Sequence, residues 1–161
     1  MTADDGVDRA RLWREAGRYF ADLDPEAARE PDEEGLVEWL DDIRERGAAD
    51  PAVLMLVAEV DGEVVGEVAA RLHEPLPSAR WQLQRDLGRR RVHVGVLAVA
   101  DDARRAGVGT ALMAAVERWA ADRGAAVITL ETGLSNPTSV PFYERRMGYA
   151  RQEVIFRKVL P

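Results

Sequence analysis

The sequence has 161 residues, no cysteine and a net charge of −7, which suits one compact domain over residues 1–161. The lack of cysteine excludes disulfides, thiolate metal sites and cysteine nucleophiles. The net negative charge, with no evident basic patch, argues against nucleic acid as a partner. No apolar run reaches the ~20 residues of a membrane span, and the first residues lack the features of a secretory signal. We therefore expect a cytoplasmic protein with neither nucleic acid nor membrane as a partner.

The first fifty residues are expected to be helical. Apolar residues between Leu12 and Leu23 recur at the spacing of one helix face. A second helix is predicted for residues 32–46, with Gly47 placed to end it. Residues 52–60 and 63–72 then form an antiparallel hairpin, because Asp-Gly between two apolar runs is a strong hairpin signal.

The rest of the chain predicts alternating strands and helices. An irregular stretch, 73–90, includes a short helix over 79–87 with Trp81, Leu83 and Leu87 as anchors. The remaining elements are a central strand at 91–99, a helix at 107–123, a strand at 125–132, a short helix at 140–147 and a strand at 153–160. The unit over 91–132 should be a right-handed parallel crossover. This order implies an α/β fold with a mixed sheet and helices on both faces.

The loop between the central strand and the helix after it has the composition of a phosphate-binding loop. Residues 104–109 read Arg-Arg-Ala-Gly-Val-Gly. The first turn of a helix offers free N–H groups and the positive end of the helix dipole, and glycine lets the backbone approach a ligand. A Walker loop would need Gly-Lys-Ser/Thr, and a dinucleotide fingerprint would need a third glycine near Leu112. A diphosphate cradle is expected.

Together with residues downstream, this loop resembles the GNAT superfamily of N-acetyltransferases. The first half of that family's signature reads here as Leu97-Ala98-Val99, four residues, and then Arg104 to Gly109. The second half reads as Leu130-Glu131, Asn136, Phe142-Tyr143-Glu144 and Gly148-Tyr149. Order and spacing agree over residues 50–160. Two departures are Asp101, where many relatives have proline, and the lack of an obvious strand before Leu12.

The resemblance implies a fold and a cofactor site. The fold would have a mixed, mostly antiparallel sheet that splays at its CoA-binding strands. Residues 1–50 would form a helical region on the acceptor side, and 51–161 the cofactor-binding core. The backbone of Leu97 and Val99 would bind acetyl-CoA, and Asn136 would hold its pantetheine arm. The diphosphate would lie on Arg104, Arg105, Ala106, Gly107, Val108, Gly109 and Thr110.

Acetylation of an amine needs a base, a donor for the acetyl oxygen and a proton for the departing sulfur. The resemblance implies that the hydroxyl of Tyr143 points at the CoA sulfur. Glu131 and His93 are both candidates for the base. Glu131 is the one charge in residues 127–132, whereas histidine titrates near neutral pH. The sequence leaves this choice open, and neither a metal nor a covalent enzyme intermediate is expected.

The sequence therefore predicts an N-acetyltransferase that acts in a ternary complex on a primary amine of a small molecule or of a protein N-terminus. Two alternatives share the same motif: a non-catalytic acyl-CoA-binding or sensing domain, and a transferase for a different acyl-CoA. The acidic charge suits a cationic acceptor, but acidity also serves solubility. A homodimer is kept as a candidate assembly.

Overall fold

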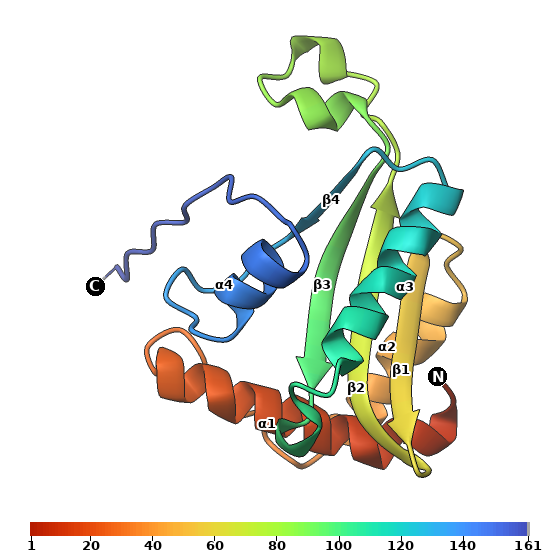
Figure 1. Ribbon diagram of the computed structural model, residues 1–161, viewed down its shortest axis with the longest axis vertical. Helices are drawn as coiled ribbons and strands as arrows, with labels where there is room; N and C mark the ends of the chain where they lie inside the picture. Colours follow the sequence, from red (N-terminus) through yellow and green to blue (C-terminus); the bar gives the residue numbers. More distant parts are fainter. Residues whose placement is uncertain (161) are drawn as a thin grey trace. The chain divides into compact units, whose positions relative to one another are not determined.

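The computed structural model describes residues 1–160, and the chain divides into two compact units, Met1–Leu130 and Glu131–Pro161. The main elements of the first unit are α1 (Gly6–Leu23), α2 (Leu36–Ala48), β1 (Val53–Val60), β2 (Glu63–His73), β3 (Arg91–Val99), α3 (Val108–Asp122) and β4 (Val127–Leu130) (Figure 1). Short 3₁₀ turns cover Ala3–Asp5, Ala79–Trp81, Arg85–Gly88 and Asp101–Ala103. Among residues 1–160, no helix combines the length and the hydropathy needed to cross a bilayer.

The sheet of the first unit is mixed and follows the order β1-β2-β3-β4. β1 and β2 are antiparallel, as are β2 and β3, whereas β3 and β4 are parallel. The hairpin turn has positive φ at both Asp61 and Gly62, which matches the twist of the flanking strands. The predicted mixed sheet is confirmed.

Helices cover both faces of this sheet. A Cβ added to Gly66 of β2 would meet the side chains of Val108 and Leu112, so α3 packs on that face. The next residue, Glu67, points to the opposite face and pairs with Arg9 of α1. On that second face α2 crosses β1, where a Cβ on Gly47 would collide with the Met55 sulfur. Figure 1 shows α3 on one side of the strands and α2 on the other.

A buried ion pair connects the first helix to the sheet. Arg9 is 1% exposed and Glu67 is 4% exposed, and the Arg9 Nε donates to Glu67 Oε2 at 2.8 Å. The Arg9 Nη1 also donates to the carbonyl of Leu40 in α2 at 3.2 Å. Loss of one partner would leave a buried charge uncompensated, which costs about 3–5 kcal/mol. The pair therefore fixes α1 against both β2 and α2.

Several expectations for the first unit need correction. α2 begins at Leu36 and runs through Gly47 to Ala48; glycine is needed there for the close approach to β1 rather than as a helix end. Residues 79–87 form two 3₁₀ turns instead of one helix. Trp81 is 69% exposed and Leu83 is 104% exposed, so neither side chain is an anchor. β4 is limited to the four residues that pair with β3.

The second unit, described over residues 131–160, has little regular structure. A helical turn, α4 (Ser139–Pro141), continues into a π-helical turn, η5 (Phe142–Arg146), and Gly148 with φ of 76° follows. The strand predicted for 153–160 is wrong: these residues have no regular secondary structure and are exposed. A strand needs a neighbour for its backbone groups, and Val154-Ile155-Phe156 is a continuous apolar run rather than the alternation of a half-buried strand.

Candidate active site

The loop from β3 to α3 has an unusual backbone. Arg105 has φ of 65° and Gly107 has φ of 91°, so both lie in the left-handed region. A Cβ added at Gly107 would meet nothing within 4 Å. Glycine is therefore favoured at this position by its backbone conformation, because other residues adopt positive φ at a cost.

Gly107 is the N-cap of α3 and places free amide groups in the loop. The N–H of Ala111 donates to the Gly107 carbonyl at 2.9 Å, so the helical hydrogen bonds begin at that point. The N–H groups of Val108, Gly109 and Thr110 precede it and have no partner within the helix, and no side chain in the described part of the chain caps this end. The first turn of α3 thus has the donors and the dipole of an anion-binding site.

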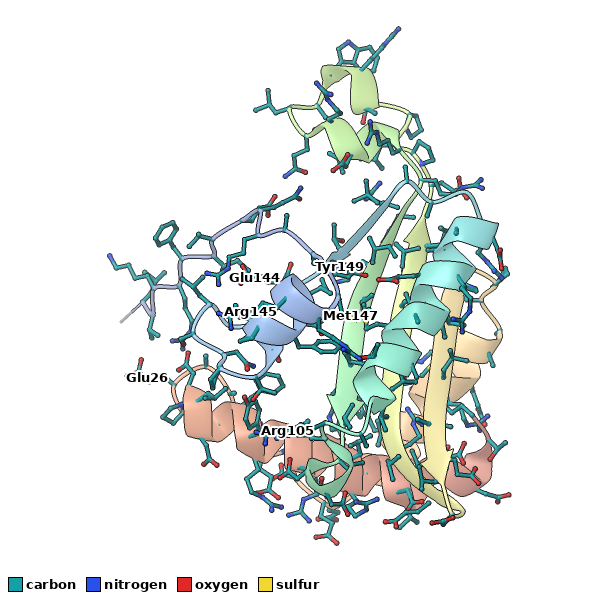
Figure 2. All side chains as sticks on the ribbon, in the orientation of Figure 1. Glu26, Arg105, Glu144, Arg145, Met147 and Tyr149 are labelled. Atoms are coloured by element: carbon teal, nitrogen blue, oxygen red, sulfur yellow. The ribbon has the colours of Figure 1, made fainter. Side chains whose placement is uncertain are left out.

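The two arginines of this loop have different environments. Arg104 donates to the Val99 carbonyl from Nε at 3.3 Å, pairs with Asp101 at 2.7 Å and lies over the Tyr19 ring at 4.9 Å. Arg105 is exposed and has no carboxylate partner within residues 1–160. Figure 2 labels Arg105 at this loop. Arg105 is therefore the cation that is available to a ligand, a distinction that the sequence did not reveal.

One edge of β3 is open beside this loop. β4 pairs with β3 only as far as Val94, and among residues 1–160 no strand pairs with that edge from Gly95 onward. The Ala100 N–H donates to Val65 on β2. Because hydrogen-bonded pairs alternate in an antiparallel ladder, Ala98 faces β2 in the same way. The backbone groups of Leu97 and Val99 therefore point to the open edge.

A β-bulge at Gly95 separates the two halves of β3. Val94 pairs with Ala70 and Val96 pairs with Ala69, so Gly95 is an extra residue in the ladder. The bulge determines the face of the sheet on which His93 lies. The sequence alone did not predict this face. His93 is opposite Arg71 and therefore on the α1 and α2 face of the sheet, and its Nδ1 is 3.2 Å from Thr129 Oγ1 on β4. An isolated glycine within a strand is the sequence signal for such a bulge.

In the second unit, Asn136 has a structural role that the sequence did not indicate. Its side chain is 2% exposed, and its Oδ1 accepts hydrogen bonds from the backbone N–H groups of Thr138 at 3.0 Å and Ser139 at 2.9 Å. These bonds cap the turn that leads into α4. The assignment of Asn136 to the pantetheine arm stays a prediction.

Tyr143 lies in η5, half-buried between aromatic rings. Its ring centroid is 5.1 Å from that of Phe142 and 6.0 Å from that of Tyr149. Desolvation raises the pKa of Tyr143 to about 12, so the hydroxyl is protonated at neutral pH. Figure 2 labels three neighbouring residues, Glu144, Arg145 and Tyr149.

The carboxylates near Tyr143 in sequence differ in their availability. Glu144 pairs with Arg151, and the hydrogen bond from that guanidinium lowers the Glu144 pKa. Glu131 is exposed and directly follows β4; the strand predicted for 125–132 would have included it. Glu131 is therefore the more available of the two as a proton acceptor.

The residues of the first unit fit the predicted acetyl-CoA. Free amides and an exposed arginine suit a diphosphate, and an open strand edge suits an extended, amide-bearing arm such as pantetheine. Within residues 1–160, no group of three or more histidine and carboxylate side chains is arranged to hold a metal ion.

The model of the acetyltransferase (GNAT) family matches residues 12–149. No curated protein matches the sequence significantly.

Solved structures show the same fold. A mutant of the BH1408 protein from Bacillus halodurans is 16% identical, with a TM-score of 0.81 over 99% of this chain and 97% of that one. A putative acetyl transferase from Pyrococcus furiosus is 25% identical, with a TM-score of 0.66 over 94% and 91% of the two chains. An aminoglycoside N-acetyltransferase in complex with CoA is 23% identical, with a TM-score of 0.59 over 79% and 90%.

Proposed function

Because the chain belongs to the acetyltransferase (GNAT) family, we propose that it transfers an acetyl group from acetyl-CoA to a primary amine by direct attack in a ternary complex. The observation that carries this proposal is the open edge of β3 beside the uncapped end of α3. These two features offer backbone donors to an extended arm and to a diphosphate, respectively.

The binding residues divide by the part of the ligand that they would hold. The amides of Val108 to Thr110 and the guanidinium of Arg105 would bind the diphosphate. The backbone of Leu97 and Val99 would pair with the pantetheine arm. Bound acetyl-CoA supplies an acetyl group that is already activated as a thioester.

Three groups of the protein would then act on the reaction. Glu131 accepts the proton that the amine loses as the N–C bond forms. A backbone N–H on the open edge of β3 donates to the acetyl oxygen, where negative charge develops. Tyr143 donates a hydrogen bond from its hydroxyl to the sulfur as the C–S bond breaks. The roles of Glu131 and Tyr143 follow from the resemblance of their motifs to those of the family.

The environment of Tyr143 suits a donor. A pKa of about 12 keeps the phenol neutral throughout the pH range in which an amine loses its proton. A thiol has a pKa of about 8.5, so the phenol is a weaker acid than the thiol that forms. We therefore expect Tyr143 to act chiefly by hydrogen bonding to the developing thiolate.

A direct test measures CoA release with a panel of amines, for the wild type and for Tyr143→Phe. We expect kcat to fall by roughly a hundredfold while the Kd for CoA changes much less, because the diphosphate and the pantetheine arm keep their contacts. Tyr149→Phe is the matched control, since it removes a hydroxyl from the neighbouring ring. Unchanged turnover of Tyr143→Phe at every pH would remove that hydroxyl from the mechanism. Tight CoA binding without turnover on any amine would instead indicate an acyl-CoA-binding protein.

A further inference from the structure

Positive charge is concentrated in one segment of this acidic protein. Residues 71–93, which we name the basic arm, contain six arginines and two acidic residues. With histidine neutral, the arm has a net charge of +4, so the rest of the chain has −11. The arm consists of the end of β2, the excursion at 74–90 and the start of β3 (Figure 1). A partner that binds the arm should therefore be acidic.

Four titratable side chains of the arm share one face of the sheet. Arg71 pairs with His93 across the strands, and His73 pairs with Arg91. Residues two apart on a strand point to the same side, so these four side chains form one group. Val92 and Val94 point to the other face and are buried.

Several cations of the arm lack an anionic partner. Arg71, Arg89 and Arg90 pair with Asp50, Asp86 and Glu74, respectively. Arg80, Arg85 and Arg91 have no carboxylate partner within residues 1–160, and Arg91 donates only to the Glu74 carbonyl at 3.5 Å. Three guanidinium groups are thus available to carboxylates of a ligand.

The electrostatic environment of His73 agrees with this distribution. Burial lowers its pKa first, and the charges of Arg91, Arg71 and His93 lower it further. A carboxylate bound beside these groups would have the opposite effect, because an opposite charge favours the protonated imidazole. His73 can therefore report whether an anion binds there.

The arm also exposes apolar side chains. Trp81 and Leu83 protrude into solvent, and the Arg80 guanidinium lies 4.0 Å from the centre of the Trp81 ring. An exposed tryptophan beside unpaired arginines is typical of surfaces that bind polypeptide. The net charge of +4 disfavours a small polyamine or aminoglycoside here.

We propose that the basic arm binds an acidic polypeptide, and that the acceptor is the amino-terminal amine of that polypeptide. This inference rests on the proposed function, because it names the substrate of that reaction. The terminal nitrogen gains the acetyl group and loses a proton, and CoA leaves as the thiol. A long polyanion such as nucleic acid is disfavoured, because the remainder of the chain at −11 would repel the parts of it that extend beyond the arm.

The spacing along β3 predicts where the acidic residues of the substrate lie. The open edge begins after Val94, and Leu97 is four residues from His93 and six from Arg91. These separations are about 13 and 20 Å in a strand. β4 pairs with β3 from Arg91 to Val94, so the substrate would leave the edge there and cross the face that carries His93 and Arg91. An extended substrate with its amine near Leu97 would place its fifth residue near His93 and its seventh near Arg91.

A matched set of peptides tests the proposal. Each has the same neutral residues at the first four positions, followed by three aspartates, three asparagines or three lysines. At low salt we expect kcat/KM for the aspartate peptide to exceed that for the asparagine peptide by about tenfold, with the lysine peptide lowest. The difference should shrink as salt is added. Equal or better turnover of the lysine peptide would overturn the proposal.

Charge reversal assigns the effect to the arm. The double variant Arg85→Glu with Arg91→Glu should invert the preference while the asparagine peptide is turned over as before. Arg118→Glu, at an exposed position on α3, is the control and should leave the preference unchanged. Preservation of the wild-type order in the double variant would contradict the assignment.

Binding is followed separately by NMR titration of His73, one of only two histidines. The aspartate peptide should raise the His73 pKa, whereas the asparagine peptide should not. No shift in pKa with the aspartate peptide would count against binding at the arm. Stronger competition by a single-stranded oligonucleotide than by the aspartate peptide would replace the polypeptide with nucleic acid.

Failure of this inference is distinguishable from failure of the proposed function. Turnover of small amines but of no peptide would overturn only the substrate. Lack of CoA binding and of turnover on every amine would overturn the acetyl transfer itself.

Discussion

The two loops that flank β3 differ in how their structure is specified. The loop after the strand has a 3₁₀ turn at Asp101–Ala103 and left-handed residues at Arg105 and Gly107, and it offers backbone amides. The excursion before the strand, residues 74–90, has no left-handed residue and exposes Trp81 and several arginines. A loop that binds its ligand through backbone amides requires glycine at fixed positions, so its sequence contains a recognisable motif. A loop that would bind through side chains shows only a biased amino-acid composition.

The largest expected effect concerns the catalytic base, for which Glu131 and His93 are the candidates. Because His93 is on β3, the result also shows whether β3 takes part in the chemistry or only in binding. We expect Glu131→Gln to lower kcat/KM by roughly 10²- to 10⁴-fold. His93→Gln should change kcat by less than about threefold if His93 only lines the acceptor site. The measurement is initial rate against pH on one amine. A large loss in His93→Gln with a small one in Glu131→Gln would assign the base to β3.

The second prediction compares one glycine from each loop. Gly107→Val should weaken CoA binding by roughly a hundredfold, because a β-branched residue at positive φ is strained and would displace the amides of α3. Gly88→Val is the control in the other loop, where an added Cβ would lie 3.4 Å from Ala79, an ordinary contact. Isothermal titration with CoA measures both variants. Equal affinities would show that the loop after β3 does not bind the diphosphate.

The smallest expected effect separates the two arginines beside that glycine. Arg105→Gln should weaken CoA binding by about tenfold, with a larger effect at low salt. Arg104→Gln should chiefly lower Tm, because Arg104 bonds to Val99 and Asp101 within the protein. Calorimetry and thermal denaturation of both variants provide the test. The reverse pattern would mean that Arg104 turns outward when CoA binds.

The sequence predicted the elements whose signals are local. The hairpin, the central strand, α3 and the glycine loop each have a periodicity or a turn signal within a few residues, and each is found in the structure. The strand predicted at 153–160 failed because strand formation depends on a distant partner. Gly47 was wrongly predicted to end the helix for a related reason. Glycine is required at this position because Met55, on another element, lies too close for a larger side chain.

In the candidate site, too, only the features with local sequence signals were predictable. The signature indicated the glycine loop and the part of β3 beside it, and the structure adds which backbone groups of Leu97 and Val99 point to the open edge. The difference between Arg104 and Arg105 depends on Asp101 and Tyr19, so no local pattern could reveal it. The grouping of Arg71 with His93 depends on strand register and was equally invisible.

The single extra residue at Gly95 has a consequence for how this protein could diversify. In a regular strand, every side chain's direction is determined by its distance in residues from every other. The bulge adds one residue at Gly95, so the alternation of side chains on the two sides of it is offset by one position. Under the proposed function, substitutions at Arg91 and His93 would alter the choice of acceptor, because both residues precede the bulge and the proposed donor half of the strand follows it. A library restricted to these two positions should yield new acceptor specificities without loss of acetyl-CoA affinity.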